Sequence, residues 1–344
     1  MKKILALILA CAWLLMVLSG CAGTSSSQAP QASESASTSQ NVSQDTDYPK
    51  RQIDLIVPYS AGGDTDLAAR AIADYLSKEW DQPIVVINQS GAVATAKEFS
   101  RAEPDGYTVM AFMSGEASCH NANNVTPTVD FSKDVTPIAR LTRFPIAFCV
   151  KADAPWADFK EFSDWVVENP DQLTWGASSM TGPAAINVAD WCNAIGADFT
   201  QTRMVQADGA ADGATKVAGG HITVHIGAPK GFMSLVDAGK CRLIAMSPFQ
   251  HTYYPEIPTA EEQGVPGMTY SNAVCLWMPN GVDQAIIDKW NAGIEKAFAD
   301  PVFQESMAKI EAMGDYLNAE DTKAFIQEEI DNYTALAEEL GLRK

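Results

Sequence analysis

A short β-rich run, a glycine turn and a segment of helical periodicity follow one another repeatedly, and this order most constrains the fold of the chain. Residues 53–59 read IDLIVPY and precede the turn Ser60-Ala61-Gly62-Gly63. The next segment, DTDLAARAIADYLSKEW, places apolar residues at helical spacing. A second strand is predicted over 83–89, a helix near 94–101, and a third strand at YTVMAF. This βαβαβ order predicts a mainly parallel sheet with helices on both faces.

The same alternation continues through the middle of the chain, where strands are predicted at 145–152, 173–178, 201–205, 221–228 and 241–247, with helices between them. The strand AVCLWM then leads into three helical stretches with no further strand of substance, and we expect these to pack on the first lobe. About 300 residues are more than one core usually accommodates. We therefore predict two α/β lobes, one formed by residues 48–144 and 275–344 and the other by residues 145–274.

The N-terminus has the pattern of an export signal. Lys2 and Lys3 precede an apolar run that ends in Leu18-Ser19-Gly20-Cys21. This predicts a signal peptide over 1–20 and a lipid on Cys21; the alternative, an uncleaved membrane anchor, has a run that is short for the ~20 residues of a permanent span. Residues 21–47 are rich in Ser, Gln, Ala and Thr and predict a disordered tether. The protein is then expected on the cell membrane, held by lipid only and facing the periplasm or the cell exterior.

Charge and cysteine content exclude several functions. The net charge is −19, and loss of Lys2 and Lys3 would make it about −21, which argues against nucleic acid and anionic membrane surfaces as partners. Five cysteines lie outside the leader and the predicted anchor, and an odd number cannot all pair within one chain. Their apolar contexts favour buried free thiols. These are Cys119, Cys149, Cys192, Cys241 and Cys275.

No arrangement typical of catalysis is present. The four histidines lie outside H-E-x-x-H and C-x-x-C patterns, and G-x-S-x-G is missing. His221 and His225 have zinc-like spacing, but HITVH reads as a strand in which four residues advance about 13 Å, so the pair could not share a metal ion. We expect no catalytic residue, no metal and no cofactor.

The turn Ser60-Ala61-Gly62-Gly63 is the strongest candidate for a binding site. Glycines after a strand let the backbone approach a ligand, and the following helix start presents N–H groups that attract anions. The alternative is a tight turn with Asp64 or Thr65 as a helix cap. The spacing and the missing lysine exclude a P-loop.

Three further turns follow predicted strands: 176–183 (GASSMTGP), 206–210 (QADGA) and 114–116 (SGE). Their hydroxyls and N–H groups could bind a carboxylate, and ordinary helix capping is the alternative. Turns at the carboxyl ends of parallel strands meet at one edge of an open sheet. We therefore expect the four turns to line one crevice.

Several motifs, in this order, resemble the periplasmic solute receptors of tripartite tricarboxylate transporters. The resemblance covers essentially all of residues 48–342. It is carried by YPKRQIDLIVPYSAGGDTDLAARAIADYL, QPIVVIN, AEPDGYTVM, VDFSKDVTPIARL, DGAADGATKVAGGHITVHIGAP, DAGKCRLIAMS and PEIPTAEEQG.

The resemblance implies a two-lobed, type II-like periplasmic-binding-protein fold that closes around a small carboxylate and delivers it to an ion-coupled permease. The carboxylate would be held by backbone N–H groups, small hydroxyls and water rather than by an arginine. We expect a monomer and no enzyme; the alternatives are a sensory or scaffolding lipoprotein and a hydrolase on the same fold. The ligand-binding residues implied are Tyr59, Ala61, Gly62, Gly63, Thr65, Asp66, Ser114, Gly115, Ser178, Ser179, Thr181, Gly182, Asp208, Gly209, Ala228 and Pro229.

The sequence departs from this family at its turns. Family members often have two prolines at Ser60 and Ala61, a small residue at Asp64, and a Tyr-Lys pair at Ala207 and Asp208. If Asp64, Glu116 or Asp208 faces the cleft, a tricarboxylate would meet like charge. This favours a ligand with one carboxylate and a cationic or polar end, such as an amino acid, over a tricarboxylate, with dicarboxylates and aromatic carboxylates also open. The alternative is that these acids cap helices or face solvent.

Overall fold

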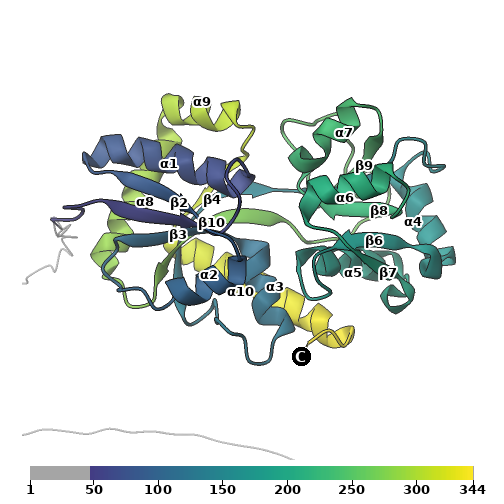
Figure 1. Cartoon of the computed structure of the whole chain (residues 1–344), viewed down its shortest axis with the longest axis horizontal. Coiled ribbons are helices and arrows are strands. Elements are labelled where there is room, and N and C mark those ends of the chain that lie inside the picture. Colours follow the sequence, from purple (N-terminus) through teal and green to yellow (C-terminus); the bar gives the residue numbers. More distant parts are fainter. Residues whose placement is uncertain (1–46, 344) are drawn as a thin grey trace, which may run out of the picture. The chain divides into compact units, whose positions relative to one another are not determined.

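A computed structural model describes residues 47–343 of the chain. The described residues cluster as one compact unit with its own hydrophobic cores. The predicted signal peptide, Cys21 and the tether as far as residue 46 lie outside the described residues. Two separate sheets, each covered by helices on both faces, organise the described part (Figure 1).

The first sheet has six strands in the order β11-β4-β10-β3-β1-β2. β1 pairs in parallel with β2 and β3, whereas β10 is antiparallel to β3 and β4, and β11 is antiparallel to β4. The bounds are β1 (Ile53–Val57), β2 (Ile84–Asn88), β3 (Thr108–Met113), β4 (Val135–Phe144), β10 (Asn272–Pro279) and β11 (Gly314–Leu317).

Strand alternation supplies one core on each face of this sheet. Ile53, Leu55 and Val57 pack with α1 and α8 on one face, and Ile56 packs with α2, α3 and α10 on the other (Figure 1). α9 contacts α1 and α8 on the first of these faces. The helices are α1 (Asp64–Trp80), α2 (Ala92–Phe99), α3 (Ser114–Asn123), α8 (Gln284–Ala299), α9 (Pro301–Lys309) and α10 (Ala319–Glu339).

The second sheet has five strands in the order β7-β6-β8-β5-β9. β6 is parallel to β7 and β8, and β5 is antiparallel to β8 and β9. α4 and α5 cover one face, and α6 with the turn η3 covers the other. The bounds are β5 (Ile146–Lys151), β6 (Thr174–Ala177), β7 (Arg203–Gln206), β8 (Val224–Gly227), β9 (Cys241–Ser247), α4 (Phe159–Glu168), α5 (Pro183–Ile195), α6 (Gly209–Ala218) and α7 (Met233–Asp237), with short 3₁₀ turns η1 (Pro170–Gln172), η2 (Phe199–Gln201) and η3 (Pro229–Phe232).

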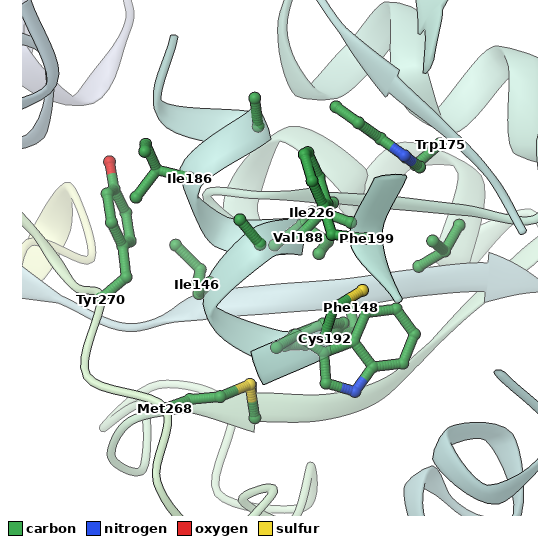
Figure 2. Packing of buried hydrophobic residues seen from close by; sticks show 14 of the residues in the cluster. Ile146, Phe148, Trp175, Ile186, Val188, Cys192, Phe199, Ile226, Met268 and Tyr270 are labelled. Carbon is green, nitrogen blue, oxygen red and sulfur yellow. The ribbon is translucent and has the colours of Figure 1, made fainter. Parts of the chain in front are cut away.

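Figure 2 shows the larger core of this second sheet, where side chains of α5 gather with those of the strands. Ile186, Val188 and Cys192 come from α5, and Phe148 and Ile226 come from β5 and β8. The same cluster includes Cys119 and Ala122 of α3 and Tyr333 and Leu336 of α10. Two helices that pack on the first sheet therefore take part in the core of the second.

The sheets are mixed rather than mainly parallel, which corrects the sequence-based prediction. β4 leaves the first sheet and β5 enters the second after one intervening residue, and β10 returns to pair with β4. A strand that leaves a sheet and the strand that returns beside it run in opposite directions. The parallel pairs are confined to the βαβ units at the far sides of both sheets.

Three elements were not predicted from the sequence. α3 has the composition SGEASCHNAN, which is poor in strong helix formers; its helix packs extensively against α10. β4 contains Pro137, but β11 pairs only with the second half of β4, so the proline lies where the strand is an edge. β11 is a strand of four residues that follows β10, where no further strand of substance was expected.

All five predicted thiols are buried and free. Burial raises the pKa of each of these cysteines. Within residues 47–343, no helix combines the length and the apolar character that a membrane crossing requires. The predicted lobe boundaries at residues 144/145 and 274/275 stay predictions; in the structure β5 begins at Ile146 and β10 at Asn272.

Candidate functional site

The predicted glycine turn connects β1 to α1. The buried carboxylate of Asp66 holds its conformation by accepting hydrogen bonds. Gly62 has a φ of 84°, which glycine adopts without strain, and its N–H donates to Asp66 Oδ2 at 2.8 Å. The same carboxylate accepts from Arg70 Nε at 3.0 Å and Asn88 Nδ2 at 2.8 Å. Burial acts to raise the pKa of Asp66, but these hydrogen bonds outweigh it and hold the pKa below the ordinary value. Asp66 therefore shapes the turn from inside, being only 1% exposed.

The outer part of this turn is open. Ala61, Gly62 and Gly63 are exposed, and Gly63 begins α1 without any side-chain cap. The first N–H groups of a helix have no partner within it and carry partial positive charge. The start of α1 can therefore bind an anion through its backbone, whereas Thr65 is buried with its Oγ1 unpaired.

Tyr59 and the start of α3 are covered. The hydroxyl of Tyr59 accepts from the N–H of Met113 at 3.4 Å, and its ring lies 5.7 Å from that of Phe112. Ser114 is 0% exposed and its Oγ donates to Glu329 Oε1 at 3.3 Å. Gly115 N donates to Asn272 Oδ1 at 3.3 Å. The predicted residues Tyr59, Ser114 and Gly115 thus each make a hydrogen bond within the protein.

Glu329 of α10, which accepts from Ser114, also accepts from two other hydroxyl groups. Its Oε2 accepts from Ser118 Oγ at 3.0 Å, and its Oε1 accepts from Tyr333 OH at 3.4 Å. Burial raises the pKa of Glu329 to about 7, and the hydroxyl hydrogen bonds act against this rise. A carboxyl group of the protein therefore already contacts the first turn of α3.

In the second lobe, the turn from β6 to α5 is ordered by its own hydroxyls. Ser179 Oγ lies 2.9 Å from Thr181 Oγ1 and accepts from Thr181 N at 3.0 Å. Gly182 begins α5 without a side-chain cap, and Ser178 is exposed. The carbonyl of Thr181 accepts from Asn123 Nδ2 of α3 at 2.8 Å, so this turn touches the first lobe.

Asp208 and Gly209, between β7 and α6, are exposed. The N–H of Asp208 donates to Asp212 Oδ2 at 2.9 Å, and Asp208 Oδ1 accepts from Gln206 Nε2 at 3.1 Å. Gly209 takes a φ of 78°. The carboxylate of Asp208 is therefore held at the rim of its turn by a neighbour in sequence.

Ala228 and Pro229, after β8, approach the first lobe. Ala228 packs against the core formed by β1, α1 and α8. The next residue, Lys230, donates from Nζ to the carbonyl of Ile310 at 2.8 Å and lies 3.9 Å from Glu311 Oε2. Tyr254 OH donates to the same Glu311 oxygen at 3.1 Å. These contacts link the two lobes.

A small pocket lies at this junction, with about 30 Å³ of space for a water-sized molecule. Asp64 from the start of α1 lines it, together with residues of both lobes. Burial is the main cause that raises the pKa of Asp64, opposed by the charge of Lys230. Of the three acids in question, Asp64 faces the junction, Asp208 is exposed, and Glu116 is half-buried in the first turn of α3.

Sequence reasoning missed most of this pocket. Thr142, His251, Tyr254 and Glu311 come from separate segments that carry no common motif. Only Lys230 could have been found, because it follows the predicted Ala228-Pro229 directly. The parallel pairing of β1 with β3, and of β6 with β7 and β8, places the predicted turns of each lobe at one edge of its sheet.

Comparisons with known proteins agree with this architecture. The sequence model of the tripartite tricarboxylate transporter family receptor, TctC, matches residues 68–342. A protein from the gbd 5′ region of Cupriavidus necator is 28% identical over 300 residues, covering 86% of this chain and 90% of its own. BugT of Bordetella pertussis is 25% identical over 307 residues, covering 88% and 93%.

Solved structures share the fold. One described as a periplasmic transporter superposes with a TM-score of 0.74 at 26% identity, covering 86% of this chain and 99% of its own. Rpa4515 of Rhodopseudomonas palustris, solved with adipate, gives 0.74 at 24% identity, with 86% and 99% covered. MatC of the same organism, solved with malate, gives 0.70 at 23%, with 84% and 99% covered. The two-lobed periplasmic-binding-protein fold is thereby confirmed, and the chain belongs to the TctC family of solute-binding receptors, which are extracytoplasmic binding proteins and not enzymes.

Proposed function

We propose that the protein captures a small carboxylate between its two lobes and delivers it to the ion-coupled permease of a tripartite transporter. The observation that carries this proposal is the exposed, uncapped start of α1 beside the junction of the lobes. Family membership supplies the class of function, and the malate and adipate bound by two structural neighbours support a carboxylate ligand.

The ligand carboxylate would be bound by main-chain N–H groups at the start of α1 in one lobe and by the turns before α5 and α6 in the other. Gly63, Gly182 and Gly209 leave the backbone accessible at these three places. Charge-assisted hydrogen bonds from several backbone N–H groups are strong enough to hold a carboxylate without an arginine. Ser178, Ser179 and Thr181 would add hydroxyl donors.

Transport would depend on closure of the lobes. A ligand shifts the balance between open and closed forms only if it binds the closed form more tightly. Ligand contacts from both lobes meet this requirement, because opening would break one set of them. The permease would recognise the closed receptor.

Attachment to the membrane is a further part of the proposal. A lipid on Cys21, after removal of residues 1–20, would hold the receptor by a tether whose ends are roughly 30 Å apart on average. Mass spectrometry of the membrane-extracted protein tests this: the first peptide should begin at Cys21 and carry acyl chains. An unmodified Cys21 in the extracted protein would contradict it.

The binding proposal is tested by thermal unfolding of the protein lacking residues 1–43, with a panel of mono-, di- and tricarboxylates and amino acids. A ligand that binds only the folded state stabilises it, by about 2.7 kcal/mol at a concentration 100 times its Kd. At least one compound should raise Tm by several degrees. No response to the entire panel, together with no small molecule retained by natively purified protein, would refute ligand capture.

A further inference from the structure

The carboxylate of Asp64 is the group at the lobe junction whose role the proposed function leaves open. Asp64 is the first residue of α1, immediately after the exposed Gly63. Within residues 47–343 it has neither a hydrogen-bond partner nor an ion pair within 4.0 Å, although it is half-buried. Its oxygens keep some contact with water and are free to accept a hydrogen bond from a ligand.

The cation nearest to this carboxylate is directed elsewhere. Lys230 lowers the pKa of Asp64 through its charge, but its Nζ donates to the carbonyl of Ile310. Glu311 accepts a hydrogen bond from the hydroxyl of Tyr254 and adds a second carboxylate to the pocket. His251 accepts from the N–H of Tyr253 through Nδ1, and burial lowers its pKa, which favours the uncharged ring. The pocket therefore contains two carboxylates and one lysine.

A second polar group in the pocket also lacks a partner. Thr142 of β4 is 2% exposed, and its Oγ1 makes no hydrogen bond to any described residue. It lines the same pocket as Asp64, from the strand that leads into the second lobe. Buried hydroxyls without partners are uncommon in proteins. Because this Oγ1 has less than 1 Å² of surface open to water, the carboxylate of Asp64 is the acceptor that a ligand can reach.

We propose that Asp64 is a specificity-determining residue that receives a primary ammonium group, so that the ligand is a small amino acid rather than a plain carboxylate. The ligand carboxylate would lie on the N–H groups that begin α1, and its ammonium would donate to the carboxylate of Asp64. The proposal rests on the carboxylate-binding function proposed above.

The size of the pocket sharpens this choice. The pocket leaves about 30 Å³ for the centre of a water-sized group, which is more than the ~10–15 Å³ that one water molecule needs by this measure. A primary ammonium group is similar in size to water, whereas a trimethylammonium group is several times larger. A second carboxylate of a dicarboxylate would meet Asp64 and Glu311 as like charges.

The test compares ligand pairs that differ only by an amino group: alanine with propionate, aspartate with succinate, and glutamate with glutarate. Titration calorimetry on the protein lacking residues 1–43 gives each Kd. At least one amino acid should bind more tightly than its partner. Asp64→Asn should weaken that amino acid by about 10- to 100-fold, the range for loss of a charged hydrogen bond, and should leave the plain acid equal or tighter.

Asp74→Asn is the matched control, because Asp74 lies on the exposed side of α1 in an ion pair with Lys78. This substitution should leave the Kd of both the amino acid and the plain acid unchanged. Equal loss in the two variants would attribute the effect to overall charge and overturn the role of Asp64.

The outcomes separate this inference from the proposed function. If succinate or glutarate binds and no amino acid does, the ammonium site is wrong while carboxylate capture stands. If Asp64→Asn binds both members as well as the parent does, the pocket holds water only. If no compound of either kind binds, carboxylate capture itself fails.

Dependence on pH gives a second readout. The ammonium group requires Asp64 to be charged, and burial raises the pKa of Asp64. The affinity for the amino acid should therefore fall as the pH decreases and Asp64 takes up a proton. Lys230, Glu311, Tyr254 and His251 also face the pocket. They remain in Asp64→Asn, so any slope left in this variant belongs to them. Identical pH profiles for parent and variant would overturn the proposal.

Discussion

Two helix starts in the first lobe, those of α1 and α3, follow neighbouring parallel strands, yet only one is open. At α1 the glycines are exposed, and the acid that orders the turn, Asp66, lies beneath it. At α3 the first residue is fully buried and contacts the carboxyl group of Glu329. Position at the carboxyl end of a strand therefore does not decide whether a helix start can bind a ligand. What decides is whether another part of the chain already occupies it.

Replacement of Glu329 by glutamine tests the closed member of this pair with the largest expected effect. The folded-state pKa of Glu329 is about 7, above its ordinary value of 4.5. The unfolded chain then loses its proton first, so stability should fall as pH rises from about 4.5 to 7, by about 3 kcal/mol in all. Glu329→Gln should remove this fall, and its free energy of unfolding should equal that of the parent near pH 4. Urea unfolding at several pH values measures it, and an unchanged pH profile would show that Glu329 is not the titrating group.

The substitutions Gly115→Ala and Gly63→Ala compare the starts of helices α3 and α1 directly. A Cβ on Gly115 would lie 2.1 Å from the hydroxyl of Tyr270, whereas one on Gly63 would meet only the carbonyl of Ser60, at 3.5 Å. Overpacking should cost Gly115→Ala about 2 kcal/mol of the free energy of unfolding, while Gly63→Ala should change it by less than about 0.5 kcal/mol. Urea unfolding at pH 7 gives both values. Similar losses in the two variants would remove the distinction between them.

Gly63→Leu probes the open start for function. The larger side chain should cover the N–H groups of the first turn and abolish the rise in Tm that a bound carboxylate produces. Circular dichroism should show that the helices are kept. Retained ligand stabilisation would remove this turn from the binding site, and Gly115 offers no equivalent test because its replacement disturbs folding.

Lys230→Met has the smallest expected effect and asks whether the lobe contact stabilises closure. The side chains of Lys230 and Glu311 are 40% and 45% exposed and 3.9 Å apart, so the pair contributes at most about 0.5 kcal/mol. Ligand affinity should fall by roughly twofold at low salt, and the difference should become smaller in 1 M salt, where only the loss of the hydrogen bond to the Ile310 carbonyl remains. A tenfold loss at both salt concentrations would instead place Lys230 on the ligand.

The sequence predicted regular elements well where periodicity was strong. α1 begins and ends at the residues expected, because DTDLAARAIADYLSKEW places its apolar side chains on one helical face. α3 could not be predicted in this way, since its ten residues include Ser, Gly, His and Asn and depend on packing against α10. β4 was not predicted, because Pro137 and two arginines interrupt its apolar pattern and its pairing with β10 and β11 is not visible in the sequence.

The candidate site divides in the same way. Turns that follow strands were found from glycines and hydroxyls, and the exposed backbone at Gly63, Gly182 and Gly209 fits the prediction that they bind a ligand, which stays a prediction. The burial of Ser114 could not be foreseen, because Glu329 lies 215 residues further along the chain. The same holds for the pocket around Asp64, which five separate segments form. Contacts of this kind depend on tertiary structure and leave no local pattern.

The inward position of every described cysteine makes the receptor suited to optical studies of its motion. All five thiols are shielded and resist ionisation at neutral pH, and thiolates are the form that reacts with maleimide dyes. A cysteine introduced on an exposed position of each lobe, such as Asp74 and Thr215, would then be labelled selectively in the protein lacking residues 1–43. Energy transfer between the two dyes could follow opening and closing in single molecules, without first removing any native sulfur.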